Sequence, residues 1–314
     1  MRLITVRLAR LAATVLTVTF LSFAAMNVFG EPLVNILGNA ALDPVGHADD
    51  IAEVTEKYHL DSPVVVAYGH WLAGLGTGDF GRSYVNEQSV STILAEKLPV
   101  TLRLVVLAQL IAIIVAVPWA VLAASKEGGI RDRGSTVVSF GLIALPEFAV
   151  GVLLFYLLVV RWRWLPSRYD GGSLLAELHS LMAPALALAL PLAAVYQRLL
   201  HTELALTLRS EFIAFARAKG NTTRRVLWLH ALRPSSFGLV TAFGMNTGAL
   251  IGGTLVVEQI FSVPGAGGAI VTAIDRDDFP TVLGFVVVIS VAFVLVNWMV
   301  DTAYQLLDPR IRVS

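Results

Sequence analysis

The sequence predicts an all-α polytopic membrane protein. Of its 314 residues, 56% are hydrophobic and 15% are charged, and the mean hydropathy is +0.73. Soluble domains carry about 25% charged residues. The 23 basic residues balance the 23 acidic ones, so net charge gives no indication of nucleic-acid binding. The chain has no cysteine, which excludes disulfides, thiolate metal sites and a cysteine nucleophile.

Six apolar segments are long enough to cross about 30 Å of hydrocarbon, which needs roughly 20 residues. They are residues 11–29, 101–124, 136–160, 181–200, 236–257 and 281–300. The first follows Arg2, Arg7 and Arg10, as a secretory signal would, but its apolar run is long for a signal and no clear cleavage site follows. We therefore predict six transmembrane helices, with the first one retained.

Lys and Arg predict the orientation of these helices. They are about twice as frequent in the segments that lie inside when the N-terminus is inside, as the positive-inside rule requires. Arg161, Arg163 and Arg168 run against the rule. We expect both termini on the cytoplasmic side.

Two connecting loops are longer than a connection requires. Residues 30–99 carry ten acidic and three basic residues, and short helices are predicted over 51–60 and 64–75, near the turn signals at Asp43-Pro44 and Asp61-Ser62-Pro63. The predicted organisation is the N-terminus and first span (1–29), a small extracytoplasmic subdomain (30–99), a five-helix membrane core (100–300) with a cytoplasmic loop (201–235), and a cytoplasmic tail (301–314).

The cytoplasmic loop predicts two helices joined by a sharp turn. Residues 211–220 read Glu-Phe-Ile-Ala-Phe-Ala-Arg-Ala-Lys-Gly, and Gly220 is suited to end a helix. Asn221 or Thr222 can cap an amphipathic second helix. Phe212, Ile213, Phe215 and Ala216 are predicted to form one apolar face. The pattern fits a rigid projection that docks a partner and, equally well, an amphipathic helix on the membrane surface.

Glu147 follows Pro146 within the third predicted span. An acidic residue at membrane depth usually faces a wet cavity or a partner, so we predict that Glu147 lines a pathway; a structural hydrogen bond is the alternative. The proline predicts a kink.

Two glycine-rich stretches follow in the last third of the chain. Gly244, Gly248 and Gly252 predict close helix packing, either within the chain or at a subunit seam or pore. Residues 262–279, with Pro264 and Gly265, predict a re-entrant or surface loop at an outer gate, with Glu258 at its rim.

Motifs that would indicate catalysis, nucleotide binding or metal binding are weak or absent from the sequence. Gly76, Gly78 and Gly81 match the dinucleotide fingerprint, but no strand run precedes them. The chain has no P-loop motif, no G-x-S-x-G and no histidine pair at metal-binding spacing. We predict no enzymatic activity and no cofactor in this chain.

The cytoplasmic loop resembles the coupling loop of permease subunits of ABC importers. The likeness is strongest to the dipeptide/oligopeptide/nickel transport family, in the subunit with a large outer loop after its first span. It is carried by residues 211–213, 216–220, 230–234, 79–83, 278–280 and 307–312, with Glu258, Phe261, Pro264, Gly265 and Gly267. Ala214 departs from the pattern, since this branch usually has arginine there.

The resemblance implies a type I ABC importer permease in the plasma (inner) membrane of a bacterium. The implied partners are a second homologous permease, two cytoplasmic ATPase subunits that bind ATP and Mg, an extracytoplasmic solute-binding protein, a peptide substrate and the lipid bilayer, without nucleic acid. Nickel or another small solute is the alternative cargo, and an ATP-independent secondary transporter is a weaker alternative because the outer loop has no counterpart in the second half.

Two groups of candidate site residues follow from the motifs and the resemblance together. The ATPase-coupling residues are Glu211, Phe212, Phe215, Ala216, Arg217, Ala218, Lys219 and Gly220. The residues of the translocation path or gate are Glu147, Glu258, Phe261, Pro264, Gly265 and Asp278.

Overall fold

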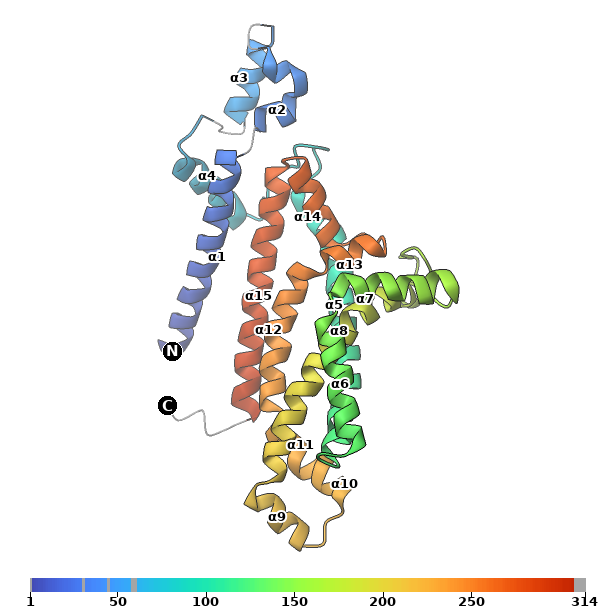
Figure 1. The fold of residues 1–314 in the computed structure, drawn as a ribbon. Coiled ribbons are helices and arrows are strands. Elements are labelled where there is room, and N and C mark those ends of the chain that lie inside the picture. Colours follow the sequence, from blue (N-terminus) through green and yellow to red (C-terminus); the bar gives the residue numbers. More distant parts are fainter. Residues whose placement is uncertain (1, 30–31, 44–45, 58–60, 308–314) are drawn as a thin grey trace. The chain divides into compact units, whose positions relative to one another are not determined.

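The computed structural model of the protein describes residues 2–29, 32–43, 46–57 and 61–307, and these are helical with short connections (Figure 1). Within this part of the chain, the β structure is one isolated antiparallel bridge between Arg82 and Ser89. The all-α prediction is confirmed. The chain divides into two compact units, Met1–Val100 with Pro264–Val294, and Thr101–Val263 with Leu295–Ser314.

The first unit contains the outer loop. Its elements are α1 (Arg2–Phe29), α2 (Pro32–Leu37), the 3₁₀ turn η1 (Gly38–Leu42), α3 (Ala48–Lys57), α4 (Val64–Gly76), the start of α5 (Val90–Ala124), α14 (Ala266–Asp275) and the first part of α15 (Phe279–Leu307). The two predicted short helices are present as α3 and α4. Pro44 and residues 58–60 lie outside the described residues.

Two apolar clusters hold this unit together. Phe23 of α1, Tyr68 of α4 and Leu283 of α15 form one, and the Tyr68 hydroxyl lies 2.8 Å from Thr19 Oγ1. Val90 and Phe285 are the fully buried centre of the other. Because α4 and the start of α5 share these clusters with α1, α14 and α15, the outer loop is packed onto helices rather than being a free linker.

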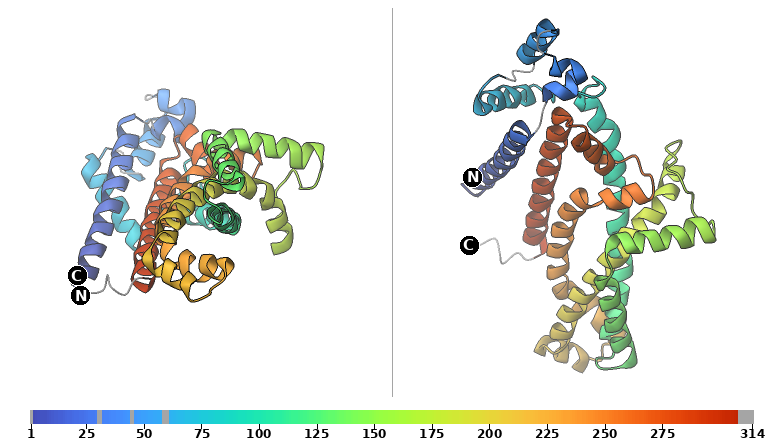
Figure 2. Two further views of the ribbon diagram at one scale, coloured as in Figure 1. Left: turned by 60° about the horizontal axis from the view of Figure 1, so that its bottom comes forward. Right: turned by 45° about the horizontal axis from the view of Figure 1, so that its top comes forward.

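The second unit contains the rest of α5 and most of the remaining helices. These are α6 (Ile130–Ala144), α7 (Glu147–Leu154), the π-helical η2 (Phe155–Arg161), α8 (Leu174–Leu208), α9 (Glu211–Ala218), α10 (Thr223–Arg225), the π-helical η3 (Val226–Ala231), α11 (Leu232–Ser235), α12 (Phe237–Gly253) and α13 (Leu255–Ile260). Helix α8 lies beside both α6 and α12 (Figure 2).

Three described helices are long and apolar enough to cross a membrane: Val90–Ala124, Leu174–Leu208 and Phe279–Val300. The bent pair of α6 with α7 and η2 makes a fourth if it is counted as one span. The predicted first and fifth spans are helical, with shorter apolar stretches over Ala12–Met26 and Phe237–Ile251. The predicted tail begins inside α15, and residues 308–314 lie outside the described residues.

The third predicted span, residues 136–160, is not a single helix. Helix α6 ends at Ala144, Leu145 is extended (φ −81°, ψ 130°), and α7 begins after Pro146 at an angle of 98° (Figure 1). Proline lacks the N–H that continues the helix, and its ring pushes the preceding residue out of the helical region. The predicted kink is therefore a break.

Buried polar side chains join the helices of the second unit. Tyr196 of α8 donates to Gln109 Oε1 of α5 at 2.8 Å, and Gln109 Nε2 donates to Thr247 of α12 at 2.8 Å. The next residue, Gln197, donates to Ser135 of α6 at 2.8 Å and accepts from Ser139 at 2.5 Å. Buried polar groups require such partners. Adjacent residues of α8 therefore bind it to α5 and α6, and Gln109 of α5 extends the network to α12.

Gly244 accounts for part of the predicted glycine packing. A Cβ at this position would lie 2.1 Å from Val300 Cγ2 of α15, which only a glycine avoids. At Gly244 the close approach is therefore within the chain.

Candidate functional site

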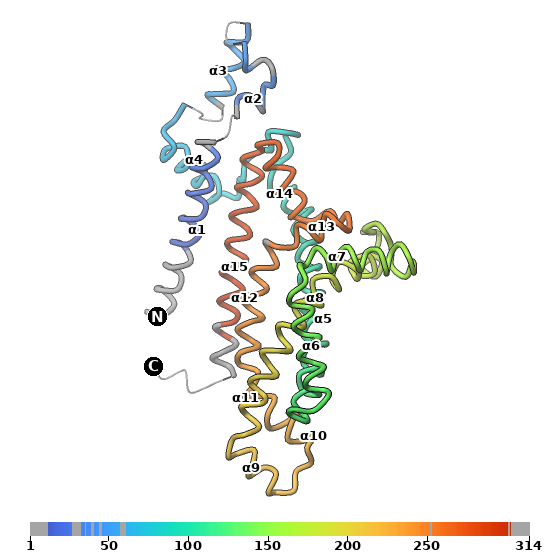
Figure 3. The backbone as a smooth tube through the Cα atoms, in the orientation of Figure 1, coloured from blue at the N-terminus to red at the C-terminus, as the bar shows by residue number. Residues whose placement is uncertain are grey.

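The predicted helix–turn–helix of the cytoplasmic loop is present. Helix α9 ends at Ala218, and the chain turns there before α10 (Figure 3). Gly220 has φ +80°, and Thr222 Oγ1 accepts from the Arg225 N–H at 3.4 Å. Asn221 does not cap the second helix; its Nδ2 donates back to the Ala216 carbonyl at 2.8 Å. A Cβ at Gly220 would meet no atom within 4 Å, so the glycine is required by its positive φ alone.

The predicted single apolar face of α9 is wrong. Ile213 and Ala216 are 0% and 7% exposed and pack within the second unit, where α9 contacts α8 and η3. Phe212 and Phe215 are 51% and 62% exposed. Each residue advances about 100° around a helix of 3.6 residues per turn, so the two pairs occupy neighbouring faces. One pair anchors α9 to its own chain, and the other pair is left for a partner.

The remaining predicted coupling residues surround the exposed phenylalanines. Glu211, Arg217, Ala218, Lys219 and Gly220 are all exposed. The Lys219 ammonium lies 4.5 Å from the centre of the Phe215 ring, a cation–π contact. The exposed surface of α9 thus combines two aromatic rings with basic groups at its C-terminal end.

Side-chain contacts connect the helix that leads into α9 to α6 and to the loop before α6. His201 Nε2 of α8 lies 3.1 Å from Asp132 Oδ1 of α6, and Arg209 pairs with Glu127. Asp132 Oδ2 also accepts from the Gly128 N–H at 2.8 Å. The sequence did not predict these contacts. Charged residues of opposite sign flank apolar segments on the same predicted side of the membrane, and that pattern would have indicated candidate pairs.

Glu147 lies at the break between α6 and α7, beside a cavity of about 240 Å³. The cavity is lined from α6, α7, α8 and α12, mostly by apolar residues, and Asn246 is its other polar side chain. Glu147 is exposed, and among the described residues its carboxylate has no hydrogen-bond or ion-pair partner. The predicted structural hydrogen bond is therefore absent from this part of the chain.

Glu258 and Phe261 are buried rather than exposed at a rim. Glu258 is 1% exposed, and its Oε1 accepts from Thr101 Oγ1 at 2.6 Å and from Thr254 Oγ1 at 3.0 Å. The Phe261 ring packs edge-on against Phe155 with centroids 5.4 Å apart. In this unit, the two residues attach α13 to α5 and η2.

The predicted loop over residues 262–279 contains a helix, α14 (Ala266–Asp275), so the loop prediction is wrong. Pro264 is exposed, Gly265 precedes the first helical residue, and Gly267 lies inside the helix. Glycine in a helix costs about 1 kcal/mol relative to alanine. Ala266, Ala269 and Ile270 of the same helix pack with the cluster around Val90, and this burial opposes that cost.

Asp278 is 4% exposed and fully partnered in the first unit. Its carboxylate accepts from Ser83 Oγ at 2.5 Å, from the Tyr84 N–H at 3.0 Å and from Thr281 Oγ1 at 2.8 Å. Two stretches that the sequence analysis singled out separately, 79–83 and 278–280, therefore meet at one carboxylate.

A second charged cluster escaped the sequence analysis. Arg103 donates to both oxygens of Glu177 at 2.5 and 2.6 Å, and the Tyr169 hydroxyl donates to Glu177 Oε1 at 2.5 Å. Burial and the hydrogen bond to this carboxylate raise the pKa of Tyr169 to about 12, so the hydroxyl stays protonated. Arg103 and Glu177 each interrupt an apolar stretch, which indicates that each needs a partner of opposite charge. Because they are 74 positions apart in the chain, the sequence alone does not show that they pair with each other.

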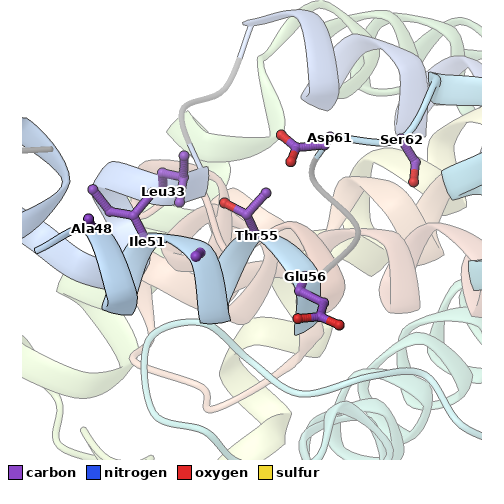
Figure 4. A pocket seen from close by; sticks show the side chains of 8 residues that line it. Leu33, Ala48, Ile51, Thr55, Glu56, Asp61 and Ser62 are labelled. Carbon is purple, nitrogen blue, oxygen red and sulfur yellow. The ribbon is translucent and has the colours of Figure 1, made fainter.

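The outer loop forms an open pocket of about 620 Å³ between α2, α3 and the residues that precede α4 (Figure 4). Leu33, Ala48 and Ile51 supply its apolar wall, and Glu56 and Asp61 supply carboxylates. The pocket is part of the first unit and is acidic at its edge.

Comparison with known proteins gives the family. Residues 116–313 match the family described as binding-protein-dependent transport system inner membrane component. The chain belongs to this family. As an inner membrane component it is a multi-pass, non-catalytic subunit with that family's permease fold and without a cofactor of its own, and its transport system includes a binding protein and an ATPase.

Several curated relatives align with this inner membrane component over nearly its whole length. The oligopeptide transport system permease protein AppB of Bacillus subtilis (strain 168) is 34% identical over 94% of each chain. The di/tripeptide transport system permease protein DppB of Pseudomonas aeruginosa (strain UCBPP-PA14) is 32% identical, covering 98% of this chain and 97% of its own. The dipeptide transport system permease protein DppB of Escherichia coli (strain K12) is 31% identical with the same coverage.

Proposed function

We propose that this chain is the transmembrane permease subunit of an ATP-driven peptide importer. It has six transmembrane helices with both termini in the cytoplasm, and it forms half of a translocation pathway with a second homologous permease. Two cytoplasmic ATPase subunits supply the energy, and an extracytoplasmic solute-binding protein delivers the peptide. The three permease relatives named above, which are described as oligopeptide, di/tripeptide and dipeptide transport system proteins, support this cargo.

The observation that carries the proposal is the arrangement of α9. A helix that inserts into a groove of another protein needs an exposed apolar face and a sharp exit of the chain, and Phe212, Phe215 and Gly220 provide both. A membrane-surface helix would instead keep all its apolar residues on one face. In α9 the apolar residues divide between an inner pair and an outer pair.

The anchored side of α9 suits it to transmit motion. Ile213 and Ala216 hold α9 against its own chain. The Arg209–Glu127 ion pair links the end of α8 to the loop before α6, and His201 of α8 lies beside Asp132 of α6. A displacement of α9 by the ATPases is therefore passed to α8, which hydrogen bonds fix to α5 and α6, and through Gln109 of α5 to α12.

Two further parts of the chain have proposed roles. The path or gate includes Glu147 at the helix break, with Glu258 and Phe261 as buried attachments of α13 and with Pro264, Gly265 and Asp278 in the first unit. The outer loop, with its excess of acidic residues and its pocket, docks the solute-binding protein or covers the pore mouth.

The test is co-purification of the ATPase subunits with variants of α9. Phe215→Ala and Phe212→Ala should each weaken assembly, since removing a phenylalanine that becomes fully buried costs about 3 kcal/mol or more. Lys219→Ala is the matched control on the same helix and should change assembly little, because exposed charge contacts contribute about 0–1 kcal/mol. ATP hydrolysis stimulated by the loaded binding protein should decrease in the same variants in which assembly is weakened.

Full assembly and full coupling in both phenylalanine variants would contradict the docking role. Uptake measured in competition, with a labelled peptide against unlabelled peptide or nickel, tests the cargo. Competition by nickel but not by peptides would replace the peptide assignment with the alternative cargo.

A further inference from the structure

Glu147 occupies an unusual position for a charged residue. Residues 134–144 of α6 are uncharged and span roughly 16 Å at 1.5 Å per residue. If α6 runs along the membrane normal, its end lies near the middle of a hydrocarbon layer about 30 Å thick. The break that follows, residues 144–148, is exposed in the second unit.

An exposed break at this depth is not compatible with lipid. The last carbonyls of α6 lack helical partners, and non-helical backbone is tolerated at membrane depth only where protein covers it or water reaches it. The first residue of a helix is favourable for a carboxylate, but that gain is smaller than the cost of placing the charge in hydrocarbon. The break and its carboxylate therefore border water or protein.

The cavity beside the carboxylate has the character of a binding site for a small ligand. It holds about 240 Å³, its walls are apolar, and Glu147 and Asn246 supply its polar atoms. Asn246 Nδ2 donates one of its two N–H groups to the Ala242 carbonyl at 2.7 Å, which leaves the other N–H as a donor and the side-chain oxygen as an acceptor. Glu147 is the one acidic side chain among the lining residues, and none of them is basic, so the cavity favours a cationic ligand over an anionic one.

We propose that Glu147 binds the ammonium group of the transported peptide at the break between α6 and α7. This inference rests on the proposed function, because a peptide is the ligand of the pathway only if the chain is a peptide permease. A peptide brings an ammonium group at its N-terminus or on a lysine side chain, together with apolar side chains for the rest of the cavity.

The first test uses the absence of cysteine from the chain. Ala249, which lines the cavity, is replaced by cysteine in the complete importer, and modification of this chain is followed by mass spectrometry. The probes are two membrane-impermeant thiosulfonates, one carrying trimethylammonium and one carrying sulfonate. Relative to free cysteine, the cationic probe should react about tenfold faster and the anionic probe about tenfold slower, as one carboxylate roughly 10 Å away produces at an effective dielectric constant of about 20.

Glu147→Gln should abolish this preference, whereas Glu96→Gln, at an exposed position of α5, should leave it unchanged. An unchanged preference in Glu147→Gln would overturn the ammonium site while leaving the pathway in place. A preference for the anionic probe in the unaltered importer would also overturn it, since a cation of the second permease would then occupy Glu147. No modification in any nucleotide state would contradict the proposed pathway at this cavity.

The second test distinguishes the two sources of the ammonium group. Trialanine is added directly, so that selection by the binding protein does not enter, and it should slow modification about threefold at twice its dissociation constant. If trialanine protects the cysteine but N-acetyl-trialanine and N-acetyl-Ala-Lys-Ala do not, the site binds the ammonium group of the peptide N-terminus. Protection by N-acetyl-Ala-Lys-Ala identifies any ammonium group, and equal protection by N-acetyl-trialanine overturns the proposal.

Discussion

Asp278 and Glu258 show how partners decide the role of an acidic residue in an apolar chain. Each is almost completely buried, and each accepts hydrogen bonds from hydroxyl groups of a segment far away in sequence. Their burial would be prohibitive without these donors. Glu147, which has no such partner in the described part of the chain, stands apart from both.

Asp278→Ala should loosen residues 82–84 of the outer loop. The substitution leaves the Ser83 hydroxyl and the Tyr84 N–H without their acceptor, at about 1–3 kcal/mol for each donor that water cannot reach. Trypsin should then cleave after Arg82 faster in the purified complex. Asp275→Ala, at an exposed position of α14, is the control and should leave the cleavage rate unchanged; equal rates in both variants would show that Asp278 does not hold this segment.

The sequence identified these residues but not their contacts. Asp278 was matched to a motif, and its neighbours in the chain gave no sign that Ser83, 195 residues away, would donate to it. Arg103 and Glu177 were missed for the same reason. Local patterns predict helices and caps, whereas hydrogen bonds between distant segments depend on the fold.

Among the elements, the break between α6 and α7 is the clearest departure from a regular span. Pro146→Ala should lengthen the distance between spin labels attached at residues 137 and 156, because the restored N–H lets the helix continue. The two backbone positions lie roughly 18 Å apart across a 98° bend and would lie roughly 28 Å apart in a straight helix of 1.5 Å rise. An unchanged distance distribution would mean that packing against α8, rather than the proline, maintains the break.

The turn after α9 depends on one backbone conformation. Gly220→Ala should reduce ATP hydrolysis stimulated by the loaded binding protein, because a left-handed conformation costs a residue with a Cβ about 1–2 kcal/mol. Gly134→Ala is the matched control, since Gly134 is helical and also faces open space. Coupling that survives Gly220→Ala and the bulkier Gly220→Val would show that the turn need not be rigid.

Element ends were predictable where a single residue sets the backbone. Pro146, Gly220 and Thr222 each act at the position that the sequence indicated. Helix α14 was not predictable in this way, because the packing of Ala266, Ala269 and Ile270 against the cluster around Val90 is not visible in the local sequence pattern. The division of α9 into two faces also required the structure.

For the whole molecule, the outer loop has two parts with different attachments. Tyr68 and residues 79–90 are packed into the first unit, whereas the lobe of α2, η1 and α3 holds the acidic pocket. Replacing residues 32–62 by a short Gly-Ser linker should therefore abolish peptide uptake and the stimulation of ATP hydrolysis by the loaded binding protein. Assembly with the ATPases and basal ATP hydrolysis should remain, which separates lost docking from misfolding. Normal stimulation in this variant would show that the binding protein contacts other parts of the importer.

The two faces of α9 carry different requirements. The inner face must keep the helix attached to its own chain, and the outer face must match the ATPase. Substitutions at residues 212 and 215 alter only what an ATPase meets, and those at 213 and 216 alter only how the helix is held. After a gene duplication, sister importers can therefore diverge in the ATPases that they accept through a few outward-facing positions. The same separation makes it feasible to transplant the ATPase preference of one permease onto another without redesigning its membrane helices.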